Sequence, residues 1–230
     1  MKTLGLIGGT TWPSTVDYYR YLNRLTGERT GGAMYPRLIL YSVNFAEYKA
    51  LADAYDWKGI ADRLSAIAVK LETAGAEALV LCANTIHIVA DIVSESVNIP
   101  LLNIVDAVGL AIKGRGVRRV ALLGTRYTME NEFYQNKLLG YGIETIVPKT
   151  DERNFVHDSI FDELVHEVLR DETKQRYLEL MDDLRGRGAE AIILGCTEIP
   201  LLIKQTDTDI PLFDSTLIHA TYAVDFALAD

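Results

Sequence analysis

The chain has 230 residues, nearly half of them hydrophobic, and a formal net charge of −9. This length and composition fit one large or two small α/β domains with an ordinary hydrophobic core. The negative charge and the lack of any run of Lys or Arg argue against nucleic acid or a membrane as a partner. The apolar stretch after Met1 is too short for a signal peptide or a membrane span, so we expect a cytoplasmic protein.

Short apolar runs alternate with helical periodicity in the first half of the chain. Ser14, with Asp17 three residues later, resembles a capping box and predicts the start of a helix. Gly8 and Gly9 allow a tight turn after the first strand, and Gly75 ends a helix. The pattern predicts strands at 3–7, 38–41, 78–82 and 99–102, and helices at 16–23, 57–74 and 85–97.

The second half repeats this order. Corresponding positions, such as Cys82 and Cys196, are separated by about 114 residues, which indicates a duplicated domain rather than a solenoid of short repeats. The pattern predicts strands at 117–124, 143–147, 191–196 and 210–213, and helices at 129–139 and 177–184.

Alternating strands and helices predict parallel sheets with helices on both faces. We expect two pseudo-symmetric α/β domains, each a βαβαβαβ unit, with the active site in the interdomain cleft. The predicted N-terminal domain comprises 1–98 plus 215–230, and the C-terminal domain comprises 99–214.

The two cysteines of the chain occupy matched positions in this repeat. Cys82 and Cys196 each end an apolar run that begins with Gly-Ala-Glu-Ala, at Gly75 and again at Gly188. A cysteine at a strand end can be an inert buried hydrophobe, but the matched placement favours a function for the pair. No Cys-x-x-Cys or Cys/His cluster occurs, so we expect free thiols and no metal site.

Two matched thiols suit the inversion of a carbon next to a carboxylate. Inversion removes a proton from one face of the carbon and delivers another to the opposite face, so it needs two acid/base groups. A thiol ionises near neutral pH, and a following helix or a nearby cation would lower its pKa further. We therefore predict Cys82 and Cys196 as the catalytic pair.

Polar residues near the predicted strand ends are candidates for holding the substrate. Backbone N–H groups and hydroxyls there could bind a carboxylate and stabilise the enolate-like charge that develops when the proton leaves. The candidates are Gly9, Thr10, Trp12, Asn84, Thr85, Thr125, Tyr127, Thr128, Thr197 and Glu198. The glycines at 5, 8 and 9 do not form a dinucleotide fingerprint and no Walker motif occurs, so we expect no cofactor.

Other conspicuous side chains have plainer interpretations. His87 and His219 could each orient a carboxylate or a thiolate, or could be helix histidines that bond a backbone carbonyl. The segment 151–153 is expected to be a solvated helix start. Aromatic residues expected to pack rather than to bind are Tyr18, Tyr19, Phe133 and Tyr134.

Several motifs together resemble those of the aspartate/glutamate racemase family over nearly the whole chain. They lie at 6–9, 42–45, 81–87, 122–130, 195–198 and 213–216. The resemblance implies a cofactor-independent amino-acid racemase, usually a homodimer, with Cys82 and Cys196 as the two bases. It also implies that the substrate α-carboxylate is held by Asn84, Thr85, Thr125, Thr128 and Thr197.

The chain departs from the aspartate-selective members of that family at two positions. Those members have a Lys in an Ile-Tyr-x-x-Val-Lys stretch, where this chain has Val165, and an Arg for which Lys49 could substitute. A bacterial branch of broader or different amino-acid preference fits better. Alternative functions are a related maleate isomerase or hydantoin racemase, or an amino-acid-binding protein without catalysis.

Overall fold

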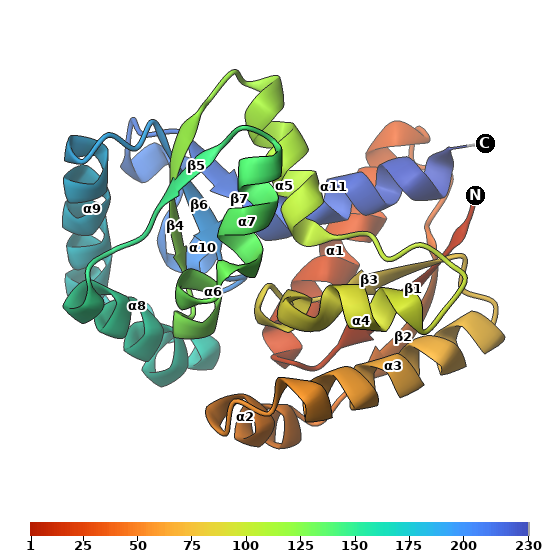
Figure 1. The fold of residues 1–230 in the computed structure, drawn as a ribbon. Coiled ribbons are helices and arrows are strands. Elements are labelled where there is room, and N and C mark those ends of the chain that lie inside the picture. Colours follow the sequence, from red (N-terminus) through yellow and green to blue (C-terminus); the bar gives the residue numbers. More distant parts are fainter. Residues whose placement is uncertain (230) are drawn as a thin grey trace. The chain divides into compact units, whose positions relative to one another are not determined.

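The computed structural model describes residues 1–229 and divides the chain into two compact units (Figure 1). Unit 1 comprises residues 1–104 together with the C-terminal segment from Thr216, and unit 2 comprises Val105–Ser215. Each unit is an α/β fold built on its own parallel sheet.

Unit 1 contains a three-stranded parallel sheet with the order β2-β1-β3. Its strands are β1 (Thr3–Gly8), β2 (Arg37–Ser42) and β3 (Ala78–Leu81). Its helices are α1 (Trp12–Arg29), α2 (Phe45–Asp53), α3 (Trp57–Thr73), the 3₁₀ helix η1 (Thr85–Val89), α4 (Ala90–Glu95) and α11 (Ser215–Leu228). The first residue of α11, Ser215, is counted with unit 2.

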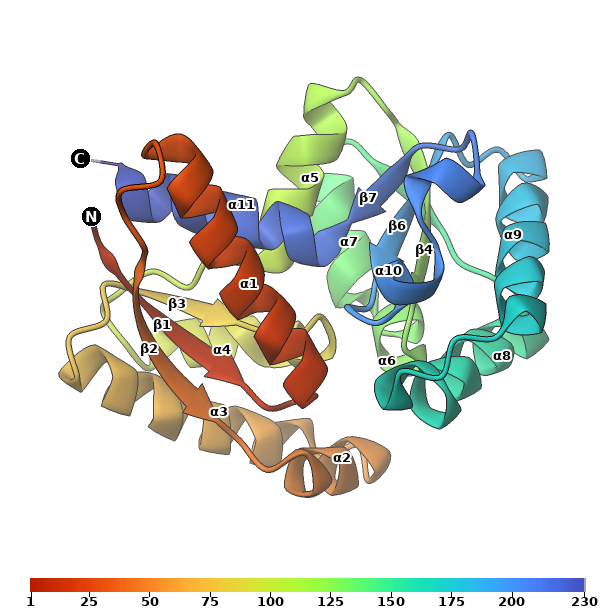
Figure 2. The ribbon, with the colours of Figure 1, turned by 180° about the vertical axis from the view of Figure 1, so that it is seen from behind.

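Helices cover both faces of this sheet (Figure 2). On one face, Tyr18 of α1 and Ala223 of α11 share a buried cluster with Leu6 and Val80 of the strands. On the other face, a Cβ at Gly5 would lie 3.2 Å from the side chain of Leu71 in α3 and 2.8 Å from that of Ala76, which follows this helix. All four residues of β3 are buried, as expected for a strand covered on both sides.

Unit 2 contains a four-stranded parallel sheet with the order β5-β4-β6-β7. Its strands are β4 (Arg119–Gly124), β5 (Glu144–Ile146), β6 (Ala191–Gly195) and β7 (Leu212–Asp214). Its helical segments are α5 (Ile104–Gly114), which starts at the unit boundary, α6 (Arg126–Glu130), α7 (Glu132–Gly140), α8 (Thr150–Asp162), η2 (Leu164–His166), α9 (Asp171–Gly186), α10 (Ile199–Leu202) and η3 (Gln205–Asp207).

The two sheets repeat one topology. The order β2-β1-β3 in unit 1 corresponds to β5-β4-β6 in unit 2, and Leu101 forms a parallel bridge to Leu79 where unit 2 has β7. The predicted α/β class with parallel sheets and flanking helices is therefore confirmed. The strand predicted at 99–102 is reduced to that single bridge.

Three predicted helices differ from the observed ones. The first begins at Trp12, because Pro13 occupies its first turn, so Ser14 lies inside the helix and is not its cap. The segment predicted at 85–97 is a short 3₁₀ helix followed by α4. The helix predicted at 129–139 is broken at Asn131, whose ψ of 135° is extended, into α6 and α7.

Helix α2 was not predicted, although the sequence contains its signal. The side chain of Asn44 accepts a hydrogen bond from the N–H of Ala46 and caps the helix, and Glu47 follows in the first turn. Asn followed by Glu three residues later is a common helix start. Among the described residues, no helix has the length and apolar character needed to cross a bilayer.

Candidate active site

Cys82 lies directly after β3, at the carboxyl end of the sheet of unit 1. Its side chain is fully buried, and its N–H donates to the carbonyl of Ile7 in the neighbouring strand β1. The Sγ atom lies 3.8 Å from the carbonyl oxygen of Val80. Because Ile7 and Leu81 are paired in register, the loops after β1 and β3 leave the same edge of the sheet.

Two hydroxyls of α1 fix these loops. Ser14 Oγ donates to the carbonyl of Cys82 at 2.6 Å, and Thr15 Oγ1 accepts from the N–H of Gly9 at 2.8 Å. Gly9 has a φ of +86°, and a Cβ there would collide with the backbone of Val43, so this turn requires glycine. The N–H of Gly9, predicted to face the substrate, is thus engaged by α1.

His87 and His219 hold the backbone around Cys82. His87 donates from Nδ1 to the carbonyl of Ala83 at 2.8 Å and accepts at Nε2 from the N–H of Ile104 at 3.2 Å. His219 donates from Nε2 to the carbonyl of Leu102 and accepts at Nδ1 from the hydroxyl of Tyr18. Of the two roles considered for these histidines, the contacts favour the one that bonds a backbone carbonyl.

Cys196 occupies the equivalent place in unit 2, directly after β6. Its side chain is 7% exposed, and its Sγ lies 2.9 Å from Oε2 of Glu198, to which the thiol donates. The hydroxyl of Thr197 donates to the same oxygen at 2.7 Å. Glu198, predicted as a substrate ligand, is 3% exposed and directs its carboxylate at the thiol.

The turn after β4 lies beside Cys196. Gly124 pairs with Gly195 in the sheet, and a Cβ at Gly124 would lie 2.8 Å from the carbonyl oxygen of Gly195. Thr125 caps α6 by accepting from the N–H of Thr128, and the two threonine hydroxyls are 3.1 Å apart. The structure therefore brings the predicted residues of this turn together with the loop of Cys196.

Burial raises the pKa of both thiols, contrary to the prediction that a helix or a cation would lower it. Loss of solvent disfavours the charged thiolate. The carboxylate of Glu198 raises the pKa of Cys196 further. The helices after the cysteines, η1 and α10, are short, with five and four residues, so they offer little compensating dipole.

The remaining candidates of unit 1 differ widely in exposure. Asn84 is buried in the loop after Cys82 and Thr85 is half-buried at the start of η1, whereas Trp12 is 65% exposed. The Oγ1 atom of Thr10 is buried, with no hydrogen-bond partner among the described residues. That hydroxyl is available to a ligand.

Arg126 lies in the turn after β4 but is not among the predicted substrate-binding residues. It follows Thr125 in the turn after β4, and its Nε is buried with no hydrogen-bond partner among residues 1–229. The backbone N–H of Arg126 donates to Nδ1 of His157. The ring of His157 also packs edge-on against Tyr127. An arginine in a turn predicted to bind a carboxylate is a signal that the sequence contains.

The two departures from the aspartate-selective pattern have clear positions. Lys49 lies on α2 and forms an exposed ion pair with Asp53 at 2.6 Å, one helical turn away. Val165 lies in η2 and packs against the core of unit 2. The ammonium group of Lys49 is thus engaged by Asp53, and position 165 carries no charge.

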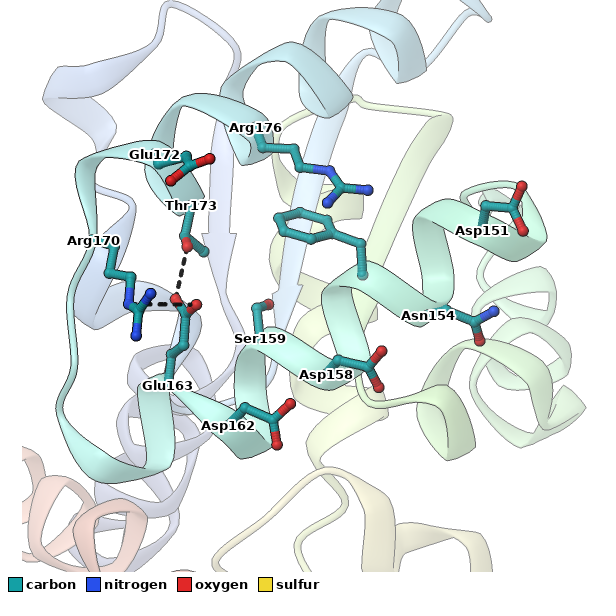
Figure 3. A pocket seen from close by; sticks show the side chains of 11 residues that line it. Asp151, Asn154, Asp158, Ser159, Asp162, Glu163, Arg170, Glu172, Thr173 and Arg176 are labelled. Carbon is teal, nitrogen blue, oxygen red and sulfur yellow. Dashed lines mark hydrogen bonds and ion pairs between the residues drawn. The ribbon is translucent and has the colours of Figure 1, made fainter.

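A polar hollow of about 480 Å³ lies elsewhere in unit 2, between α8 and α9 (Figure 3). Its arginines already have partners, since Arg170 pairs with Glu163 at 3.7 Å and Arg176 stacks on the ring of Phe155. None of the predicted substrate-binding residues lines it. Among the described residues, no group of three His, Cys, Asp or Glu side chains could hold a metal ion.

Curated relatives of this chain include amino-acid racemases. The broad-specificity amino-acid racemase RacX of Bacillus subtilis is 25% identical over 98% of both chains. A glutamate racemase of Persephonella marina is 30% identical over 64% of this chain and 57% of its own.

Two solved structures match the full length of this chain and are matched over their own full length. A candidate Asp/Glu racemase from Yersinia pestis has a TM-score of 0.93 at 43% identity. An aspartate racemase homologue from Pyrococcus horikoshii has a TM-score of 0.88 at 41% identity. The model of the Asp/Glu/hydantoin racemase family matches residues 7–223. The chain therefore belongs to the Asp/Glu/hydantoin racemase family, a family of isomerases.

Proposed function

We propose that the protein is a cofactor-independent amino-acid racemase in which Cys82 and Cys196 are the two bases. The observation that carries the proposal is the equivalence of the two thiols. Each is a free cysteine directly after the strand that pairs with the first strand of its unit, in two sheets of one topology. A duplicated fold that retains one thiol in each copy supplies the paired acid and base that inversion requires.

The proposed reaction moves one proton at each thiol. One cysteine, as thiolate, takes the Cα proton, so that the C–H bond breaks, an S–H bond forms and the electron pair stays on the substrate. The other cysteine, as thiol, donates a proton to the opposite face of Cα. The product is the other enantiomer, and the two cysteines have exchanged protonation states.

The proposed substrate contacts are the loops beside each cysteine. We propose that Asn84, Thr85, Thr125, Thr128 and Thr197 bind the α-carboxylate, and that donors there stabilise the charge that spreads from Cα in the transition state. Thr10, with its buried unpaired hydroxyl, and Arg126, with its buried Nε, support binding of an acidic group. Gly9, Trp12 and Tyr127 complete the proposed pocket walls. The substrate's own ammonium group would favour a thiolate that burial otherwise disfavours.

The named relatives support an amino acid as the substrate, and the lack of the aspartate-type lysine at Val165 supports a preference other than strict aspartate. We further propose a cytoplasmic homodimer as the working form. Light scattering on the purified protein and fractionation of cells that express it would check both statements.

The test is a panel of the twenty amino acids in L and D form, incubated with the protein and resolved by chiral chromatography. Racemisation of at least one amino acid, with solvent deuterium appearing at Cα, is expected. Maleate and a substituted hydantoin belong in the panel, because conversion of either one alone would identify a related isomerase instead. Binding of an amino acid without deuterium incorporation would identify a non-catalytic binding protein.

A further inference from the structure

His87 bridges two stretches of unit 1 that are far apart in the sequence. Its Nδ1 atom lies 2.8 Å from the carbonyl oxygen of Ala83, directly after Cys82, and its Nε2 atom lies 3.2 Å from the backbone nitrogen of Ile104. The side chain is 3% exposed, so bulk water does not mediate either contact. One imidazole ring therefore ties the turn that follows Cys82 to the segment 102–104.

The two backbone partners of His87 fix the state of its ring. A carbonyl oxygen only accepts, so the ring hydrogen must be on Nδ1, and a backbone N–H only donates, so Nε2 must keep its lone pair. Only the neutral imidazole in one tautomer meets both demands. An apolar side chain of similar size would fill the space but would leave two backbone groups without partners, which is unfavourable in a buried place.

His219 holds the same segment from helix α11. Its Nε2 donates to the carbonyl of Leu102 at 2.6 Å, and its Nδ1 accepts from the hydroxyl of Tyr18 on α1 at 2.7 Å. His219 is fully buried, and burial lowers its pKa to about 4, which keeps the ring neutral at ordinary pH. The rings of His87 and His219 meet edge-on, with centroids 5.6 Å apart. The two histidines thus support residues 102 and 104 together.

Helix α1 reaches the turn of Cys82 from the other side. Ser14, one helical turn before Tyr18, donates to the carbonyl of Cys82 at 2.6 Å, and His87 binds the next carbonyl along the chain. The sulfur takes no part in these bonds and lies 3.8 Å from the carbonyl oxygen of Val80. The network therefore sets the direction in which the side chain of Cys82 leaves the backbone without engaging its proton.

Resting on the proposed function, we propose that His87 is a positioning residue for racemisation, which holds the turn of Cys82 so that the thiol meets one face of Cα. His219 and Tyr18 support it by fixing the segment to which His87 is bonded. His87 exchanges no proton with the substrate, and its effect is confined to the step that Cys82 performs. A displacement of a reacting group by about 1 Å can lower a rate by about 10²-fold.

The test measures at which thiol the damage falls. Cys82→Ser and Cys196→Ser each keep one base, so in D₂O each should exchange the Cα proton of a different enantiomer without inverting it. His87→Leu should lower kcat/KM by about 10- to 100-fold. It should also shift the ratio of the two exchange rates, measured by NMR, towards that of Cys82→Ser. A general loss of structure would lower both exchange rates together.

Two further variants test the bonds themselves. His87→Gln offers one donor and one acceptor, so it should recover part of the rate and move the exchange ratio back towards that of the wild type. Tyr18→Phe removes only the hydroxyl from which His219 accepts. Its exchange ratio should shift in the same direction as that of His87→Leu, by about two- to fivefold.

Two matched controls should keep the wild-type exchange ratio. Tyr134 is a fully buried tyrosine of unit 2 whose hydroxyl has no hydrogen-bond partner among the described residues, so Tyr134→Phe removes a hydroxyl without removing a bond. Glu77 accepts from the backbone N–H of Thr3 at 2.6 Å, at the amino end of β1. Glu77→Ala therefore removes a bond between a side chain and the backbone of unit 1 at the end of the sheet opposite to Cys82.

The outcomes separate this inference from the proposed function. A wild type that racemises no amino acid contradicts the proposed function itself. A wild type that racemises, with a folded His87→Leu variant whose exchange ratio is unchanged or moves towards that of Cys196→Ser, overturns the positioning role alone. Circular dichroism establishes that each variant is folded, and if His87→Leu is not, the ratios of His87→Gln and Tyr18→Phe decide in the same way.

Discussion

The surroundings of Cys82 and Cys196 show how far duplication determines chemistry. Both thiols are buried after equivalent strands, yet the thiol of Cys82 lies near the backbone carbonyl of Val80, whereas the thiol of Cys196 faces the carboxylate of Glu198. The shared topology repeats the position of the cysteine but not its neighbours. The two thiols are therefore expected to differ in how they gain and lose protons, even though the proposed reaction treats them symmetrically.

The largest expected effect comes from removing either thiol. Cys82→Ser and Cys196→Ser should each lower kcat/KM by about 10³-fold or more, because a hydroxyl is too weak an acid to replace the thiol. In D₂O each variant should exchange the Cα proton of one enantiomer only, and the two variants should prefer opposite enantiomers. NMR of the recovered amino acid measures this, and wild-type turnover in either variant would contradict the two-base assignment.

The next effect concerns the pH dependence of stability and comes from His219, in unit 1. Burial lowers the pKa of His219 to about 4, from 6.5 in the unfolded chain. The unfolded chain therefore takes up a proton first as the pH falls, and stability that is present above pH 6.5 is lost towards pH 4. The loss attributable to His219 is about 3 kcal/mol.

Denaturant unfolding of the wild type and of His219→Gln at about pH 7 and pH 4 would measure how much unfolding free energy each protein loses on acidification. Between these pH values His219→Gln should lose about 3 kcal/mol less unfolding free energy than the wild type. His166→Gln, at an exposed position of unit 2, is the control and should follow the wild type. Equal acid sensitivity in all three proteins would show that His219 does not carry this pH dependence.

A smaller effect is expected from the hydroxyl that holds the Cys82 loop. Ser14→Ala leaves the carbonyl of Cys82 without its buried donor and should lower the free energy of unfolding by about 1–3 kcal/mol. Ser159→Ala breaks comparable buried hydrogen bonds to Val156 and Tyr177 in unit 2 and should cost a similar amount.

The two serine variants should differ in activity. Ser14→Ala is expected to lower kcat by about tenfold, because the loop of the proposed catalytic thiol Cys82 loses its support, while Ser159→Ala should not change kcat. Steady-state kinetics at a temperature where both variants are folded would show this. Equal activities would mean that the Ser14 contact stabilises the fold without positioning Cys82.

The smallest expected effect is at Lys49. Its ion pair with Asp53 is exposed, so Lys49→Ala should change the free energy of unfolding by no more than about 0.5 kcal/mol. The KM for acidic amino acids should also stay the same, because the ammonium group is held on the surface of α2. A large rise in that KM, confined to acidic substrates, would instead make Lys49 a side-chain ligand.

The sequence alone determined the repeating α/β order, the end of each cysteine strand and the family, because these follow from apolar periodicity, glycine turns and short motifs. It did not determine where the first helix starts, since Pro13 and the capping pattern at Ser14 compete locally. The break at Asn131 is likewise a matter of local backbone geometry that periodicity does not reveal.

Only the tertiary structure decided what each polar residue of the site does. It assigned Ser14 to the carbonyl of Cys82, the two histidines to backbone groups, and Glu198 to the thiol of Cys196. It also reversed the expected direction of the thiol pKa values, because desolvation outweighs a short helix dipole. A sequence names the groups that are present, whereas distance and burial decide which of them exchange a proton.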